Sequence, residues 1–125
     1  MMSMVKRILV FDDDPTIFDI IKYVLEEKGW EVLSSGDSND VVNKIKHIKP
    51  DIIMMDNHIP DHGGIVATQN IKMQKELQHI PVIFFTASED VKDLAKRAGA
   101  DAFLAKPFGL ETLYGVIKQL LPAEV

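Results

Sequence analysis

The amino-acid sequence predicts an α/β fold built on an open, doubly wound parallel sheet of five strands, (βα)5. Short apolar runs alternate along the chain with longer amphipathic segments, and all but one of these runs are apolar throughout. A strand that is apolar throughout is typical of a parallel sheet covered on both faces. With 125 residues the chain is too short for a closed (βα)8 barrel, so the open sheet remains. The predicted strands are 8–11, 31–33, 52–55, 82–85 and 102–105.

The segments between these strands carry the end signals of helices. The first predicted helix has Asp14 as a good N-cap, Pro15 as its first residue, apolar residues at helical spacing, and Gly29 just past its end. The other predicted helices span 38–48, 64–77, a segment from a Ser88 cap to Gly99, and 110–121 ahead of Pro122. Each strand is therefore followed by a helix, and the crossovers must be right-handed.

Composition excludes several classes of protein. Apolar residues make up 46% and charged residues 26% of the chain, which is typical of a soluble globular domain. The net charge of −5 argues against direct nucleic-acid binding, and the lack of cysteine excludes disulfides and thiolate metal sites. The N-terminal residues do not resemble a signal peptide, and no apolar run approaches the length of a membrane-spanning helix. We therefore expect one cytoplasmic domain over 1–125, with its core at about 6–121, and no membrane contact.

Polar side chains follow four of the five predicted strands. They are Asp12, Asp13 and Asp14 after the first strand, Asp56 after the third, Thr86 after the fourth and Lys106 after the fifth. In open α/β sheets the carboxyl ends of the strands form the binding edge. Crowded carboxylates need a proton or a cation, and an all-oxygen ligand set favours Mg²⁺, with Mn²⁺ as a substitute. A lysine and a threonine suit phosphoryl oxygens, and one carboxylate could form an aspartyl phosphate.

In their order and spacing, these residues resemble the receiver domain of two-component response regulators over nearly the whole chain. The matching motifs are ILVFDDDP at 8–15, DIIMMDNHIP at 51–60, GG at 63–64, PVIFFTA at 81–87 and GADAFLAKPF at 99–108. The resemblance implies a flavodoxin-like strand order of 2-1-3-4-5. It also implies a phosphorylation-controlled signalling switch that catalyses its own phosphorylation and slow dephosphorylation, and not an enzyme that turns over a separate substrate.

The resemblance further implies a role for each residue of the acidic cluster. Asp56 would be the phosphoacceptor, and Asp13, Asp56 and the main-chain carbonyl of His58 would ligate Mg²⁺. Asp12 would hold a metal-bound water, and Lys106 would pair with a phosphoryl oxygen.

A second set of implied roles concerns switching. Thr86 would bond a phosphoryl oxygen, and Phe103 would change rotamer on activation. His58 and Ser88 would set the lifetime of the acyl phosphate, and the Lys106–Pro107 peptide would be cis. The family's usual Asp-Gly is here Gly63-Gly64, which we expect to loosen the turn into the third helix.

The partners implied are a histidine kinase or a histidine phosphotransfer protein, and an unidentified downstream protein. Phe18, at the edge of the apolar stripe of the first predicted helix, is a candidate anchor for the phosphodonor, although it could equally extend the core. Val116 stands where the OmpR-like subfamily typically carries an arginine for its dimer contacts. We therefore expect a monomer or weak dimer.

One alternative is an enzyme. The segment 8–16 also fits the hhhhDxDxT motif of haloacid-dehalogenase-like phosphatases, with Asp12 as nucleophile and Asp14 as acid–base. Against it, the only acids after Lys106 are Glu111 and Glu124, and the chain leaves no room for a cap domain. The two hypotheses differ in which aspartate becomes phosphorylated, Asp12 or Asp56.

Overall fold

The computed structural model describes residues 5–121; Pro122 and the two ends of the predicted domain lie outside that range. Strands and helices alternate, as predicted, and each helix follows its strand. The strands are β1 (Arg7–Phe11), β2 (Glu31–Ser35), β3 (Ile52–Asp56), β4 (Val82–Thr86) and β5 (Ala102–Ala105). The helices are α1 (Pro15–Glu27), α2 (Val41–Ile48), α3 (Gly63–Met73), α4 (Val91–Ala98) and α5 (Leu110–Leu120).

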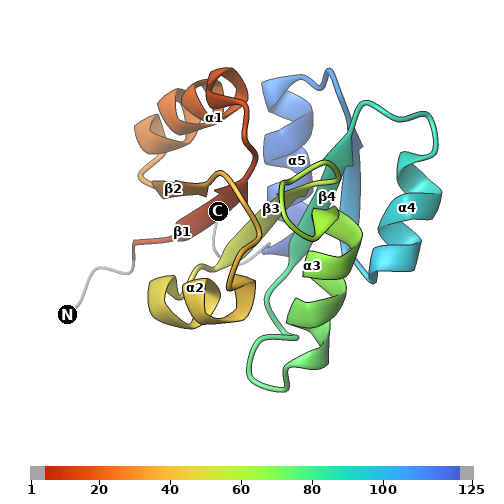
Figure 1. The fold of residues 1–125 in the computed structure, drawn as a ribbon. Helices are drawn as coiled ribbons and strands as arrows, with labels where there is room; N and C mark the ends of the chain where they lie inside the picture. The colour runs from red at the N-terminus through yellow and green to blue at the C-terminus, as the bar shows by residue number, and fades with distance from the viewer. Residues whose placement is uncertain (1–4, 122–125) are drawn as a thin grey trace.

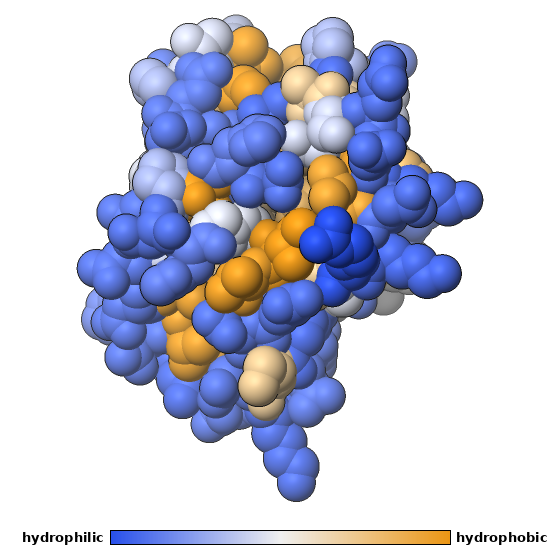
Figure 2. Space-filling view, turned by 45° about the vertical axis from the view of Figure 1, so that its right-hand side comes forward, coloured by the Kyte–Doolittle hydropathy of each residue, from blue (hydrophilic) through white to orange (hydrophobic). Residues whose placement is uncertain are grey.

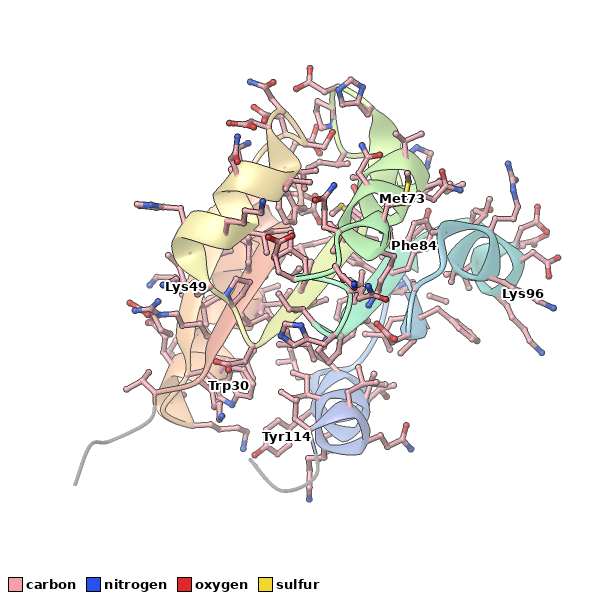
Figure 3. The ribbon with its side chains drawn as sticks, turned by 90° about the horizontal axis from the view of Figure 1, so that it is seen from below. Trp30, Lys49, Met73, Phe84, Lys96 and Tyr114 are labelled. Atoms are coloured by element: carbon pink, nitrogen blue, oxygen red, sulfur yellow. The ribbon has the colours of Figure 1, made fainter. Side chains whose placement is uncertain are left out.

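The strands form one parallel sheet in the order β2-β1-β3-β4-β5, which confirms the expected topology (Figure 1). Successive residues of a strand point to opposite faces of the sheet. In β1, Ile8 and Val10 pack against α1 and α5, whereas Leu9 and Phe11 pack against α2 and α3. Figure 3 shows Phe84 of β4 on the face of the sheet that α3 and α4 cover. Tyr114 lies on α5, which covers the opposite face. Residues 8–11, 52–55 and 82–85 of the central strands are all apolar because both faces of these strands meet a helical layer.

The strand β5 departs from this pattern. Its sequence predicts burial on both faces, but β5 is an edge strand in which only Leu104 is buried and Phe103 is 42% exposed. An apolar run does not reveal whether a helix covers the second face of an edge strand. On the side shown in Figure 2, most of the surface is hydrophilic and apolar side chains emerge as a narrow band.

Both ends of α1 agree with the prediction, whereas the start of α2, the end of α3 and the start of α4 differ from it. The Asp14 side chain accepts a hydrogen bond from the Thr16 N–H, and Gly29 has a φ of +90°. Helix α2 begins at Val41, not at 38, because the Ser38 hydroxyl bonds the loop at Pro60 and His62 and Asp40 has a left-handed backbone conformation. Helix α4 begins at Val91 after Asp90, not after a Ser88 cap. The predicted extension of α3 to 77 is also wrong.

The chain leaves α3 after Met73 because a turn at Gln74 brings two apolar side chains inward. Leu77 and Ile80 become buried against the α2 and α3 side of the core. This burial outweighs the continuation of a helix whose next residues are polar. Within residues 5–121, no helix combines the length and the apolar character needed to cross a membrane.

Candidate functional site

Three carboxylates meet at the carboxyl ends of β1 and β3. Phe11 of β1 is paired with Met55 of β3, so the residues that follow them lie side by side. One carboxylate oxygen from each of Asp12, Asp13 and Asp56 lies within 4.8 Å of the others. Asp12 and Asp56 are 5% and 3% exposed, whereas Asp13 faces solvent. The strand ends therefore bring together the acidic cluster that the sequence predicts.

Lys106 reaches into this cluster from the β5–α5 loop. Its Nζ lies 3.4 Å from Asp12 Oδ2 and 3.4 Å from Asp56 Oδ1. The same ammonium lies 4.9 Å from the centroid of the Phe85 ring, a cation–π distance. The Lys106–Pro107 peptide is cis. One positive charge is thus shared between two buried carboxylates.

Asp56 contributes a buried carboxylate oxygen that lacks a hydrogen bond. This oxygen, Oδ1, has Lys106 at ion-pair distance. Burial raises the pKa of the Asp56 carboxyl above its ordinary value of 3.8, and the charge of Asp12 acts in the same direction while Lys106 opposes it. An underbonded oxygen among three carboxylates is the donor set that a hard divalent cation prefers. The residues present therefore fit Mg²⁺.

The raised pKa of Asp56 predicts a pH-dependent stability difference between the wild type and Asp56→Asn. Folding raises this pKa, so the stability that the protonated Asp56 carboxyl contributes is fully present below its unfolded pKa. That contribution is lost as the pH rises through the folded pKa. We expect Asp56→Asn in EDTA to melt about 2–5 °C above the wild type at pH 8. The difference should narrow as the pH falls below the folded pKa toward the unfolded value of 3.8, measured by thermal denaturation followed by circular dichroism. A constant difference across this range would contradict the electrostatic origin.

The predicted switch residues lie on neighbouring strands. Thr86 ends β4 fully buried, and its Oγ1 accepts a hydrogen bond of 3.3 Å from the Ser88 N–H. Phe103 lies on β5, opposite Phe84 in the register, with its ring exposed. His58 is exposed in the β3–α3 loop, and its N–H donates to the Asp56 carboxylate.

Two features of the site were missed by sequence reasoning. Gly64 lies so close to β3 that a Cβ there would be 2.4 Å from the Asp56 carbonyl oxygen. An apolar cavity of about 410 Å³ adjoins Lys106, between α1 and the loops after β4 and β5. Ile20 lines this cavity and is 48% exposed, whereas Phe18 is half-buried against the core. Helical spacing alone does not distinguish the two positions.

Comparison with known proteins assigns the family. The family model of the response regulator receiver domain matches residues 8–118 of this chain. The chain belongs to this family. The receiver domain is 32% identical over 118 residues to the alkaline phosphatase synthesis regulator PhoP of Bacillus subtilis, covering 93% of this chain and 48% of that protein. It is 31% identical over 120 residues to the phosphate regulon regulator PhoB of Escherichia coli, covering 94% of this chain and 52% of that protein.

Solved structures agree. The chemotaxis response regulator CheY4 of Vibrio cholerae matches with a TM-score of 0.84 and 25% identity, covering 94% of this receiver domain and 99% of that chain. A second match is the receiver domain of a Pseudomonas aeruginosa sensor histidine kinase, whose structure has a magnesium ion coordinated in the active-site cleft. Its TM-score is 0.85 and its identity 26%, covering 95% of this receiver domain and 99% of that chain.

The family membership decides between the two functional classes. The receiver domain is a phosphorylation-controlled signalling switch, and the phosphatase alternative is not favoured. The chain spans about half the length of the curated relatives it matches.

Proposed function

We propose that Asp56 is the phosphoacceptor of this receiver domain and that its donor is a phosphohistidine of a histidine kinase or a histidine phosphotransfer protein. The observation that carries the proposal is the buried Asp56 Oδ1, which lacks a hydrogen bond and lies 3.4 Å from Lys106 Nζ. Asp13, Asp56 and the main-chain carbonyl of His58 would hold Mg²⁺, or Mn²⁺ in its place, with Asp12 acting through a water. We also propose that this takes place in the cytoplasm.

In the proposed step, an Asp56 carboxylate oxygen attacks phosphorus, a new O–P bond forms and the N–P bond of the donor breaks. The bonding electrons leave with the imidazole nitrogen. Bound Mg²⁺ supplies positive charge against the carboxylates and the phosphoryl oxygens. Lys106 pairs with one phosphoryl oxygen and Thr86 donates a hydrogen bond to another. Attack by water later releases phosphate and restores Asp56.

The experiment that tests this function is intact-mass analysis of the receiver domain with acetyl phosphate. With Mg²⁺ present we expect the protein to gain one phosphoryl group. With EDTA in place of Mg²⁺, we expect no gain, because nothing then offsets the repulsion between the carboxylates and the phosphate. A protein that stays unmodified with Mg²⁺ present would refute the proposed activity.

The proposed output couples Thr86 to Phe103. When Thr86 moves inward to bond the phosphoryl group, the space it leaves admits the Phe103 ring, which is exposed before phosphorylation. A shift from mostly inactive to mostly active needs about 3–5 kcal/mol, the order of one charge-assisted hydrogen bond and one partly desolvated ion pair. The face made by α4, β5 and α5 then changes for an unidentified partner protein. Val116 on α5 supports a monomer or weak dimer.

His58 is expected to tune the lifetime of the acyl phosphate. Its backbone N–H bonds the Asp56 carboxylate, and its exposed side chain follows the phosphoacceptor by two positions. Ser88, two residues after Thr86, is proposed to share this role. We expect His58→Ala to change the half-life at least about threefold, because a group that orients or activates water alters hydrolysis strongly. The measurement is the rate at which the phosphoryl mass is lost at pH 6 to 8. Identical decay rates in the wild type and His58→Ala would exclude a role for the His58 side chain in hydrolysis.

Ile20 is expected to help dock the phosphodonor. It is the exposed apolar residue of α1 in the cavity beside Lys106, so a donor protein that covers this cavity would contact it. We expect Ile20→Ser to slow transfer from a phosphohistidine protein about tenfold while leaving acetyl phosphate labelling unchanged. Tyr23→Ser is the matched control, since Tyr23 is 71% exposed on the same helix and does not line the cavity. Equal slowing with both donors would argue against docking.

A further inference from the structure

Ser38 connects the β2–α2 loop to the loop that follows the phosphoacceptor. Its side chain is fully buried. The Ser38 hydroxyl donates a hydrogen bond of 2.9 Å to the Pro60 carbonyl oxygen, and its Oγ accepts one of 3.0 Å from the His62 N–H. The Ser38 N–H also donates to the Pro60 carbonyl oxygen at 3.0 Å. A single side chain therefore satisfies groups on two residues of a different loop.

The loop that Ser38 holds runs between β3 and α3 and carries His58. Its near end is fixed by the Asn57 N–H, which donates to the Phe85 carbonyl oxygen at 3.0 Å. Its middle is fixed by the Ile59 side chain, which is 2% exposed. The Ser38 hydrogen bonds fix the far end, at Pro60 and His62. The position of the His58 main chain thus depends on anchors at both sides of it.

Loss of the Ser38 hydroxyl would free the far end of this loop. Pro60 would keep one hydrogen bond, from the Ser38 N–H, but the His62 N–H would lose the acceptor described above. A part-buried N–H that loses its acceptor must find water instead, so the loop would shift toward solvent. Such a shift moves the His58 carbonyl relative to Asp56 while the carboxylates stay on their strand ends.

We infer that Ser38 is a positioning residue for the divalent cation of this receiver domain, acting by fixing the loop that presents the His58 carbonyl. The inference rests on the proposed function, in which that carbonyl is a metal ligand. Groups that orient metal ligands change metal affinity by about 10- to 100-fold when they are removed. Ser38 acts through the backbone of a neighbouring loop, so we expect the low end of that range.

The test is calorimetric titration of MgCl2 into the wild type, Ser38→Ala and a control variant. Ser35→Ala is the matched control, because Ser35 lies before the same loop and its hydroxyl donates to Asp37 and accepts from Lys44, on the β2–α2 side. We expect Ser38→Ala to bind Mg²⁺ about tenfold more weakly, and Ser35→Ala to bind within twofold of the wild type. We also expect Mg²⁺ to raise the melting temperature of Ser38→Ala less than that of the wild type, because stabilisation follows the ratio of ligand concentration to Kd.

The outcomes separate this inference from the proposed function. If the wild type binds Mg²⁺ and Ser38→Ala binds it equally well, Ser38 has only a structural role and the inference is wrong, even where the variant melts lower. If the wild type binds no Mg²⁺, the proposed function itself fails. Should Ser38→Ala not fold, Ser38→Cys replaces the hydroxyl with a weaker hydrogen-bonding thiol. The cysteine variant should then bind Mg²⁺ measurably more weakly than the wild type, and unchanged binding would overturn the inference.

Discussion

Asp56→Asn is expected to abolish phosphoryl incorporation from acetyl phosphate in the presence of Mg²⁺. The asparagine amide keeps the size of the side chain beside Asp12 and Lys106 but is not a nucleophile toward phosphorus. Intact-mass analysis should detect no phosphorylated protein, a loss of about a hundredfold or more relative to the wild type. The melting temperature measured in EDTA provides the folding control, since this variant is expected to be more stable than the wild type at pH 8.

A matched variant on the neighbouring acid sharpens this test. Asp12→Asn retains Asp56, so we expect slower labelling that still occurs at Asp56, located by peptide mass analysis. The reason is that Asp12 contributes charge near the metal and Lys106, 3.4 Å from its Nζ, while the proposed nucleophile is untouched. A phosphoryl group found on Asp12 in the Asp56→Asn protein would contradict the assignment of the phosphoacceptor.

The sequence predicts the fold and the acidic cluster because both depend on local patterns. Parallel strands that are buried on both faces read as apolar runs, and the residue after each run falls at one edge of the sheet. Asp12 and Asp56 are therefore placed together before any contact is known, as the carboxylate distances confirm. The roles of these residues in phosphoryl transfer remain predictions.

Contacts between loops far apart in the sequence were not predictable in this way. Ser38 bonds Pro60 and His62 across more than 20 residues, and nothing in its own neighbourhood indicates this, so the sequence favours a helix start there. The exposure of Phe103 depends on β5 being an edge strand, and the end of α3 depends on the burial of Leu77 and Ile80. Each of these outcomes is decided by tertiary packing and not by local propensity.

Gly64→Ala is expected to have the largest effect on stability among single substitutions near the site. A Cβ at this position would lie 2.4 Å from the Asp56 carbonyl oxygen and 2.8 Å from Asn57 Cα, and both are backbone atoms. Backbone cannot rotate away as a flexible side chain can, so either α3 or the end of β3 must move. We expect the free energy of unfolding to fall by about 3 kcal/mol, measured by urea denaturation.

The same substitution should also impair phosphorylation, because the displaced atoms belong to Asp56 and its neighbour. In the fraction that remains folded, we expect labelling by acetyl phosphate to slow at least about tenfold, since small misplacement of a reacting group strongly lowers the rate. Gly115→Ala is the matched control: a Cβ there meets nothing within 4 Å, and alanine in α5 should raise stability by about 0.5–1 kcal/mol. A Gly64→Ala protein as stable and as rapidly labelled as the wild type would mean that the close approach of α3 to β3 does not position Asp56.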